Sequence, residues 1–311
     1  MLIALRCYPR SFNFSHFVGG WICLHRLVIN HILAYKNIGM FIVKMKDSKV
    51  ASEFYLDNDA VKAFDTEFRD WDAYCSVLSS LGIPRSTKIK VLDIGGGNGI
   101  FLDRLLDYFP NATGVVLDYS QYMLDRNTHN PRKKVMQGSA TDIDALLLGE
   151  NYDLVTINVL LHHLVGENEE QNLINISRCL KSLHYILAGK GKLVVYEQVY
   201  EGWLRQPSPG EIIYRITRIK SGAFASLMKR LGANTGGVGV RFRSIEGWQG
   251  IFERHNFRSI HTGFVLEDKP SIFRKIFLNV RKVGSYLFVL EIQNVGARSK
   301  SGHHPAHGID E

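Results

Sequence analysis

The chain of 311 residues carries 38 lysines and arginines against 30 aspartates and glutamates, and 45% of it is apolar. This length fits one large domain or two small ones. The apolar fraction, together with 17 Phe, 13 Tyr and 4 Trp, excludes disorder as a description of the whole chain. Glycine and proline, at 28 and 8 residues, are close to average use, which excludes collagen-like and low-complexity sequences.

The basic character is concentrated in residues 1–46. No acidic residue precedes Asp47, whereas this leader contains six basic ones: Arg6, Arg10, Arg26, Lys36, Lys44 and Lys46. The remaining chain holds 32 basic and 30 acidic residues, so we expect no nucleic-acid partner.

Three interpretations of the leader stay open. It is an unstructured extension before a true start at Met40 or Met45, a segment for organellar import, or a membrane contact. Membrane contact is the least favoured, because His31 and Lys36 interrupt the most apolar part and leave it too short to span a bilayer.

The four cysteines, Cys7, Cys23, Cys75 and Cys179, form no metal-ligand spacing with each other or with histidine. We therefore expect reduced cysteines, no metal and a cytoplasmic protein, unless the leader directs import into an organelle.

Beyond the leader, the pattern of apolar residues predicts cap helices within 47–84 and then an alternation of strands and helices. Strands are expected at 88–94, 112–117, 134–137, 152–157 and 192–197, with helices at 100–108, 121–127 and 173–188 and a turn at 189–191. This alternation predicts an α/β fold with a doubly wound parallel sheet, formed by a core at 85–200.

The rest of the chain departs from this alternation. We expect a helical lid insertion at 201–240, and a C-terminal part of the core at 241–295 with a helix at 245–254 and strands at 261–266 and 285–292. A disordered tail is expected at 296–311.

The strongest chemical signal follows the first strand, where Asp93 precedes a run of glycines at 95, 96, 97 and 99. Glycine allows unusual backbone angles and a close approach of the chain to a ligand. Ile100 occupies the position where a nicotinamide fingerprint needs a small residue, and no lysine follows as in a phosphate-binding P-loop. Asp118 ends the second strand, where an acid can accept the ribose hydroxyls of an adenosine ligand; its alternative role is to cap the helix that follows.

With these residues the chain resembles the class I S-adenosylmethionine-dependent methyltransferases. Residues 242–248 and 256–257 resemble those of the family's small-molecule members. The resemblance implies a Rossmann-like, doubly wound seven-stranded sheet, mostly parallel with the last strand antiparallel. It also implies S-adenosyl-L-methionine as cofactor and S-adenosyl-L-homocysteine as product. The cofactor-binding residues it implies are Asp93, Gly95, Gly96, Gly97, Gly99, Asp118, Tyr119, Ser139, Ala140 and Asn158. Ser139 stands where the family usually has an acid, and the backbone of Ala140 and the nearby Asp142 are the candidates to replace it.

His162 and His163 follow the fourth strand, where an acceptor should dock, and are the candidate catalytic residues. One of them would act as general base, or both would only shape the pocket. Glu197 and Tyr196, at the end of the fifth strand, would orient an acceptor or serve only in packing or hydrogen bonding.

The sequence thus predicts methyl transfer to the O or N atom of a small molecule, by a monomer or homodimer. Two alternatives stay open: a methyltransferase acting on RNA or protein, and a binding protein of the same fold without catalysis.

Overall fold

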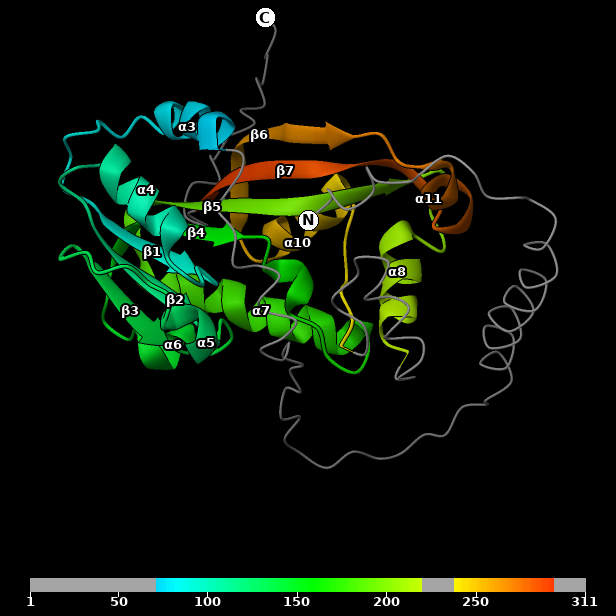
Figure 1. Cartoon of the computed structure of the whole chain (residues 1–311), viewed down its shortest axis with the longest axis horizontal. Helices are drawn as coiled ribbons and strands as arrows, with labels where there is room; N and C mark the ends of the chain where they lie inside the picture. The colour runs from blue at the N-terminus through cyan, green and yellow to red at the C-terminus, as the bar shows by residue number, and fades with distance from the viewer. Residues whose placement is uncertain (1–70, 220–237, 294–311) are drawn as a thin grey trace, which may run out of the picture. The chain divides into compact units, whose positions relative to one another are not determined.

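Seven strands form one mixed sheet in the computed structural model, which describes residues 71–219 and 238–293. The strands are β1 (Lys90–Ile94), β2 (Thr113–Asp118), β3 (Lys133–Gln137), β4 (Tyr152–Asn158), β5 (Leu187–Gly202), β6 (Phe257–Asp268) and β7 (Val280–Ile292). Their order is β3-β2-β1-β4-β5-β7-β6 (Figure 1). Strands β1 to β5 pair in parallel, and β7 runs antiparallel to both β5 and β6. This confirms the predicted Rossmann-like fold with its antiparallel last strand.

Helices connect the strands and cover both faces of the sheet. They are α3 (Trp71–Ser80), α4 (Ile100–Tyr108), α5 (Gln121–Leu124), α6 (Ile143–Leu146), α7 (Glu169–Ile186), α8 (Pro209–Thr217), α10 (Ile245–Arg254) and α11 (Ile272–Phe277), with a short 3-10 turn, η4 (Leu161–His163). Side-chain oxygens cap several N-termini, for example Asn168, which accepts a hydrogen bond from Gln171 N–H at 2.9 Å. Such caps explain where these helices begin.

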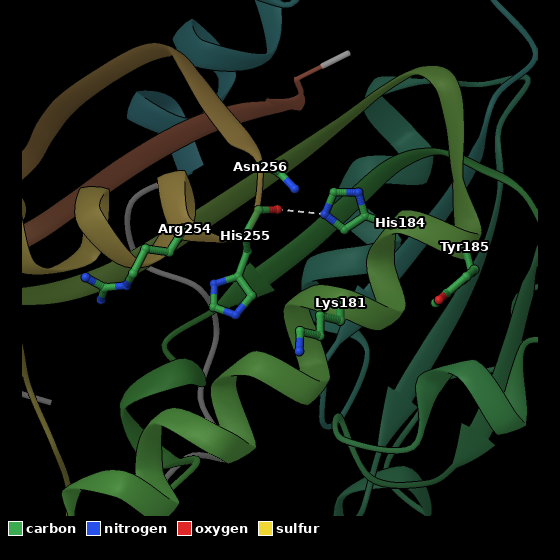
Figure 2. Close-up of a pocket in the computed structure, with 6 residues that line it drawn as sticks. All are labelled: Lys181, His184, Tyr185, Arg254, His255 and Asn256. Carbon is green, nitrogen blue, oxygen red and sulfur yellow. Dashed lines mark hydrogen bonds between the residues drawn. The ribbon is translucent and has the colours of Figure 1, made fainter. Parts of the chain in front are cut away.

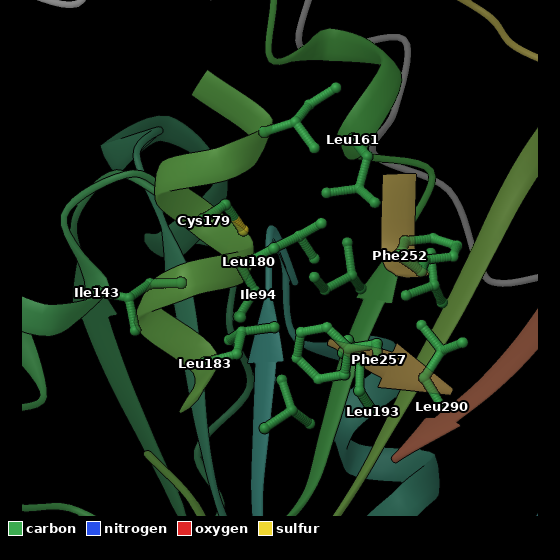
Figure 3. Close-up of a cluster of buried hydrophobic side chains, with 14 of the residues drawn as sticks. Ile94, Ile143, Leu161, Cys179, Leu180, Leu183, Leu193, Phe252, Phe257 and Leu290 are labelled. Carbon is green, nitrogen blue, oxygen red and sulfur yellow. The ribbon is translucent and has the colours of Figure 1, made fainter. Parts of the chain in front are cut away.

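One hydrophobic core lies between the sheet and the face covered by α6, α7 and α10. Figure 3 shows Leu180 and Leu183 of α7 directed toward the strands, with Leu193 of β5 and Phe252 of α10 beside them. All four are fully buried. Alternate residues of the strands supply this core, as the period of two in a β-strand requires.

A second core lies on the opposite face, under α3 and α4. Tyr74 of α3 and Phe101 of α4 meet edge to face, with ring centroids 4.8 Å apart. The strands contribute the residues that point away from the first core, such as Val91 of β1 and Leu154 of β4. Strands buried on both faces explain why these segments read as continuous apolar runs.

The boundary between α7 and β5 differs from the prediction. The sequence predicts a helix to residue 188 and a turn at 189–191, but α7 ends at Ile186 and β5 begins at once. The pairing of β4 with β5 shifts register between Tyr152 and Leu154. A Cβ atom on Gly191 would lie 2.9 Å from Tyr152 O, so this glycine permits a close approach of two strands and not a turn.

The remaining boundaries are close to expectation. The helix predicted at 121–127 is shorter, and both late strands extend further than 261–266 and 285–292. Strand β5 reaches into the predicted lid insertion, which begins with strand up to Gly202 before α8. The leader, the tail from 296 and the middle of the insertion lie outside the described residues.

The chain returns to the sheet at 238–244, before α10. Here Arg243 forms an isolated parallel bridge with Val199, and Tyr200 N–H donates to Arg243 O at 3.1 Å. Arg241 N–H donates to His162 O at 2.9 Å. This segment is thereby fixed against both β5 and η4.

Candidate functional site

The glycine-rich turn between β1 and α4 is the centre of the candidate site. Gly95, Gly97 and Gly99 have positive φ angles of 71°, 54° and 73°, which favour glycine. At Gly96 the constraint is space, because a Cβ atom there would lie 2.4 Å from Asp93 Oδ2. Side chains at these positions would strain or displace the turn.

One carboxylate oxygen of Asp93 accepts hydrogen bonds, and the other has no hydrogen-bond partner. Its Oδ1 accepts hydrogen bonds from Thr156 Oγ1 at 2.8 Å and from Asn158 Nδ2 at 3.4 Å. Among the described residues, the buried atoms Asp93 Oδ2 and Asn158 Oδ1 have no hydrogen-bond partner. Burial raises the pKa of Asp93 to about 7, against the opposing effect of the bond from Thr156. Two buried acceptors at neighbouring strand ends suit a ligand that donates hydrogen bonds.

Asp118 ties the end of β2 to the glycine-rich turn. Its Oδ2 accepts a hydrogen bond from Gly97 N–H at 3.0 Å, and its Oδ1 accepts one from Ser120 N–H at 2.8 Å. Burial raises the pKa of Asp118, and these backbone bonds oppose that rise. Because a carboxylate oxygen can accept more than one hydrogen bond, Asp118 can hold the turn and still bind a ligand beside Tyr119.

Ser139 and Ala140 follow the end of β3, next to β2 in the sheet. The Ser139 hydroxyl accepts a hydrogen bond from Thr141 N–H at 3.1 Å, so it stabilises its own turn. Asp142 pairs with Arg178 of α7 at 2.8 Å. The structure therefore directs Asp142 toward α7 and does not support it as a replacement for the missing acid.

His162 and Glu197 form a buried pair between the ends of β4 and β5. His162 Nδ1 lies 2.6 Å from Glu197 Oε2, and Glu197 Oε1 accepts a hydrogen bond from Leu161 N–H at 2.6 Å. The two residues are 3% and 0% exposed. Because a carboxylate oxygen accepts, Nδ1 carries a proton and donates it to Glu197, and Nε2 is the ring nitrogen left outside this hydrogen bond.

Aromatic rings surround this pair. Phe242 stacks on His162 with ring centroids 4.6 Å apart, and Tyr200 stacks on the same Phe242 at 4.5 Å. The half-buried His163 ring lies 4.2 Å from that of His162. Burial lowers the pKa of His163 well below its usual value, and His162 lowers it further, so His163 is neutral at neutral pH.

A polar network supports the glycine-rich turn from outside. Asn127 Nδ2 donates to Gly97 O at 2.9 Å and to Leu124 O at 3.1 Å. Behind it, Lys133 pairs with Asp103 of α4 at 2.6 Å, and the Lys133 side chain is only 1% exposed. This network joins the turn to α4 and to the start of β3.

A hollow lies away from these residues. Figure 2 shows it between the C-terminal turns of α7 and α10, lined by Lys181, His184, Tyr185, Arg254, His255 and Asn256. His184 Nε2 donates to His255 O at 2.7 Å. The hollow opens at the edge where β5 and β6 begin, so it is separate from the strand ends that carry Asp93 and Glu197. Its cations, Lys181 and Arg254, complement the negative C-terminal ends of the α7 and α10 helix dipoles, which explains why basic residues lie there.

The structure brings the sequence-predicted residues together at one edge, since β3, β2, β1, β4 and β5 are neighbours in the sheet. Sequence reasoning missed the roles of Thr156 and Asn127 and the pairing of Glu197 with His162. The position of Glu197 at a strand end was the available signal for that pairing. Within residues 71–219 and 238–293, no group of His, Cys, Asp or Glu side chains could hold a metal ion, and no helix is long and apolar enough to cross a membrane.

Known proteins resemble this chain in the same region. Residues 92–182 match the family described as a methyltransferase domain. A malonyl-[acyl-carrier protein] O-methyltransferase of Acetivibrio thermocellus is 26% identical over 103 residues, which cover 30% of this chain and 36% of the relative. The enzyme of that name from Bacillus cytotoxicus is 26% identical over 110 residues, which cover 35% of each chain. The match therefore spans about a third of these curated relatives.

Two solved structures also resemble the chain. One is the complex of the Haloferax volcanii Trm112 methyltransferase activator with a putative methyltransferase, at 14% identity and a TM-score of 0.49, covering 76% of this chain and 95% of that chain. Another is Haemonchus contortus phosphoethanolamine N-methyltransferase 2, at 14% identity and a TM-score of 0.48, covering 72% of this chain and 53% of that chain.

The strand order and the glycine-rich turn define a Rossmann-like fold. The matched methyltransferase domain, residues 92–182, lies within this fold and contains the glycine-rich turn and Asp118.

Proposed function

We propose that this protein transfers the methyl group of S-adenosylmethionine to an O or N atom of a small molecule, with His162 as general base. The observation that carries the proposal is the buried His162–Glu197 pair at the strand edge that also holds Asp93 and Asp118. A carboxylate that fixes the tautomer of a histidine is an arrangement typical of proton transfer.

The described residues fit the cofactor. The unpartnered oxygens Asp93 Oδ2 and Asn158 Oδ1 would accept hydrogen bonds from the ammonium group of its methionine part. Asp118 would accept the ribose hydroxyls, and the turn at Gly95–Gly99 would leave room beside them. Tyr119, Ser139 and Ala140 would contact the adenine. The bound cofactor supplies an electrophilic sulfonium methyl group.

The protein then has to place the acceptor atom and remove its proton. His162 Nε2 would take the proton from an acceptor hydroxyl or ammonium as the acceptor forms its bond to the methyl carbon and the carbon–sulfur bond breaks. Glu197 would stabilise the resulting imidazolium through Nδ1. His163 stays neutral and, with Phe242, excludes water from the pair. The aromatic rings favour an apolar or aromatic acceptor.

The presence of His162 as a base also bears on the chemical class of the methyl acceptor. The two curated relatives are, by their names, O-methyltransferases of a malonyl group. A free carboxylate has no proton to lose on methylation, so its reaction needs no base. The His162–Glu197 pair therefore favours a hydroxyl or amine acceptor for this chain.

The test combines three variants with a panel of phenols, amines and carboxylic acids. His162→Asn should lower turnover at least about 100-fold, the lower end of the range for general base catalysis, and leave the Kd for S-adenosylmethionine unchanged. Glu197→Gln should do the same, because its amide would donate to His162 Nδ1, move the proton to Nε2 and remove the acceptor nitrogen. His163→Asn is the matched control and should retain most turnover.

Calorimetric titration and release of S-adenosylhomocysteine measure the two effects separately. Absence of cofactor binding by the folded wild-type chain would refute the proposal as a whole. Full turnover of His162→Asn on a phenol or amine would remove His162 as base. Turnover confined to carboxylic acids and insensitive to His162 would identify a carboxylate methyltransferase.

A further inference from the structure

Six large apolar side chains are exposed together where β5 ends. Their exposed fractions run from 43% to 74%: Trp203, Leu204, Ile272, Phe273, Ile276 and Phe277. We call these residues the tip surface. Four of them belong to α11, a helix without a single buried residue, which lies beside the C-terminal end of β5 (Figure 1). A helix that directs its apolar residues to solvent is informative, because such residues normally cover a core.

One side chain holds the two halves of the tip surface together. Asn279 lies two residues after the end of α11, at a positive φ of 54°. It accepts hydrogen bonds at Oδ1 from Trp203 N–H at 3.2 Å and Leu204 N–H at 3.1 Å. Its Nδ2 donates to Leu204 O at 2.9 Å. Phe273 and Phe277 stack at 4.9 Å within α11. The surface is therefore a fixed feature of the fold.

The surroundings of the tip surface are basic. Residues 203–207 and 268–281 contain five basic residues and one acidic residue, Asp268; the basic ones are Arg205, Lys269, Arg274, Lys275 and Arg281. None of these five has an ion-pair partner among the described residues. An apolar surface flanked along the chain by cations is complementary to a lipid surface with anionic headgroups.

We propose that the tip surface docks on the surface of a membrane that contains anionic lipids. Charge argues against two other occupants. A second copy would bring two basic surfaces together, and residues 1–46 and 220–237 contain basic residues but no acidic ones, so like charge would oppose contact in both cases. The membrane attracts the cations, and its interface takes up the apolar side chains.

Position links the tip surface to the candidate site. Strand β5 continues from Glu197 to Gly202, and Trp203 follows directly. At about 3.3 Å per residue, the tip surface lies roughly 20 Å beyond the His162–Glu197 pair along one strand. Docking would therefore bring the acceptor edge of the sheet close to the membrane.

The test is sedimentation of the full chain with vesicles, without S-adenosylmethionine. We expect binding to vesicles of phosphatidylcholine mixed with phosphatidylglycerol, weaker binding at high salt, and little binding to phosphatidylcholine alone. The double variants Trp203→Ser/Ile276→Ser and Lys275→Glu/Arg281→Glu should each lower partitioning at least about tenfold. Leu148→Ser, at a side chain that is 81% exposed elsewhere, and Lys88→Glu, at another exposed position, are the matched controls and should bind like the wild type.

Several results would overturn the proposal. One is a wild-type chain that does not sediment with anionic vesicles. A second is equal binding by both double variants, which would assign the contact to other residues such as the leader. A third is a dimer that the apolar variant converts to a monomer, with no vesicle binding. None depends on methyl transfer, so the outcome is independent of the proposed function.

Discussion

Gly99 offers the sharpest perturbation of the candidate site, because an alanine there would meet both an unfavourable backbone angle and a neighbouring side chain. Its φ is 73°, and a Cβ atom would lie 1.9 Å from Asn127 Oδ1 and 2.9 Å from Lys133 Nζ. Gly149 is the matched control. Its φ is 83°, but a Cβ atom there would have nothing within 4 Å.

The structure sets the expected magnitudes. Gly149→Ala should cost about 1 kcal/mol in the free energy of unfolding, the cost of alanine in the left-handed region. Gly99→Ala adds the displacement of Asn127, which would lose its hydrogen bonds to Gly97 O and Leu124 O at about 1 kcal/mol each. The total is about 3 kcal/mol. These costs correspond to falls in Tm of about 2–4 °C for Gly149→Ala and about 6–12 °C for Gly99→Ala.

The assay is a double-mutant cycle read by thermal or urea unfolding. In an Asn127→Ala background the clash with Asn127 is gone and only the contact with the flexible end of Lys133 remains. Gly99→Ala should then cost only about 1 kcal/mol, with a coupling of about 2 kcal/mol between the two sites. Equal costs of Gly99→Ala in both backgrounds would refute the reasoning, because they would show that Asn127 does not resist the added methyl group. Gly99→Ala should also weaken S-adenosylmethionine binding, whereas Gly149→Ala should leave it unchanged.

Two carboxylates of the site give further predictions. Asp93→Asn should raise the free energy of unfolding at pH 8. Burial holds the pKa of Asp93 at about 7 in the folded protein, against 3.8 in the unfolded chain. The contribution of Asp93 to stability is therefore fully present below pH 3.8 and is lost as the pH rises through 7, by up to about 4 kcal/mol. Asp93→Asn should also lose affinity for the cofactor in calorimetry. The control Asp107→Asn, at an 81% exposed side chain, should change neither the free energy of unfolding nor the cofactor affinity. A wild-type chain whose stability does not change between pH 4 and 7 would contradict the argument. Asp118→Ala should weaken cofactor binding at least tenfold, about 1.4 kcal/mol, because it removes the acceptor and the anchor of Gly97; unchanged affinity of the folded variant would take Asp118 out of the site.

The sequence predicted the fold because its signals are local. A strand, a glycine-rich turn and a helix follow one another within residues 90–108, and Asp118 closes the next strand, so the order of elements in this part fixes the edge where a ligand binds. Local signals also explain one error. Glycines at 189 and 191 are typical of a turn, but at 191 the glycine serves a close approach to Tyr152, which depends on pairing between distant segments.

The pairing of His162 with Glu197 could not be predicted for a similar reason. The two residues are 35 positions apart, and their contact depends on the parallel register that sets Asn158 against Tyr196. A shift of one residue would turn Glu197 to the other face of the sheet. Sequence periodicity shows that a strand exists, but does not give its register against a neighbour.

The return of the chain at 238–244 also protects the sheet. Strand β4 ends at Asn158, opposite Tyr196, so the part of β5 from Val199 onward has no strand on that side. The bridge to Arg243 and the hydrogen bond from Tyr200 N–H to Arg243 O occupy this open edge, which would otherwise be free to recruit a strand of another molecule. The same segment carries Phe242 onto the His162 ring. Resistance to aggregation and support of the candidate base therefore depend on the same few residues, and a change that frees this segment from β5 should impair both together.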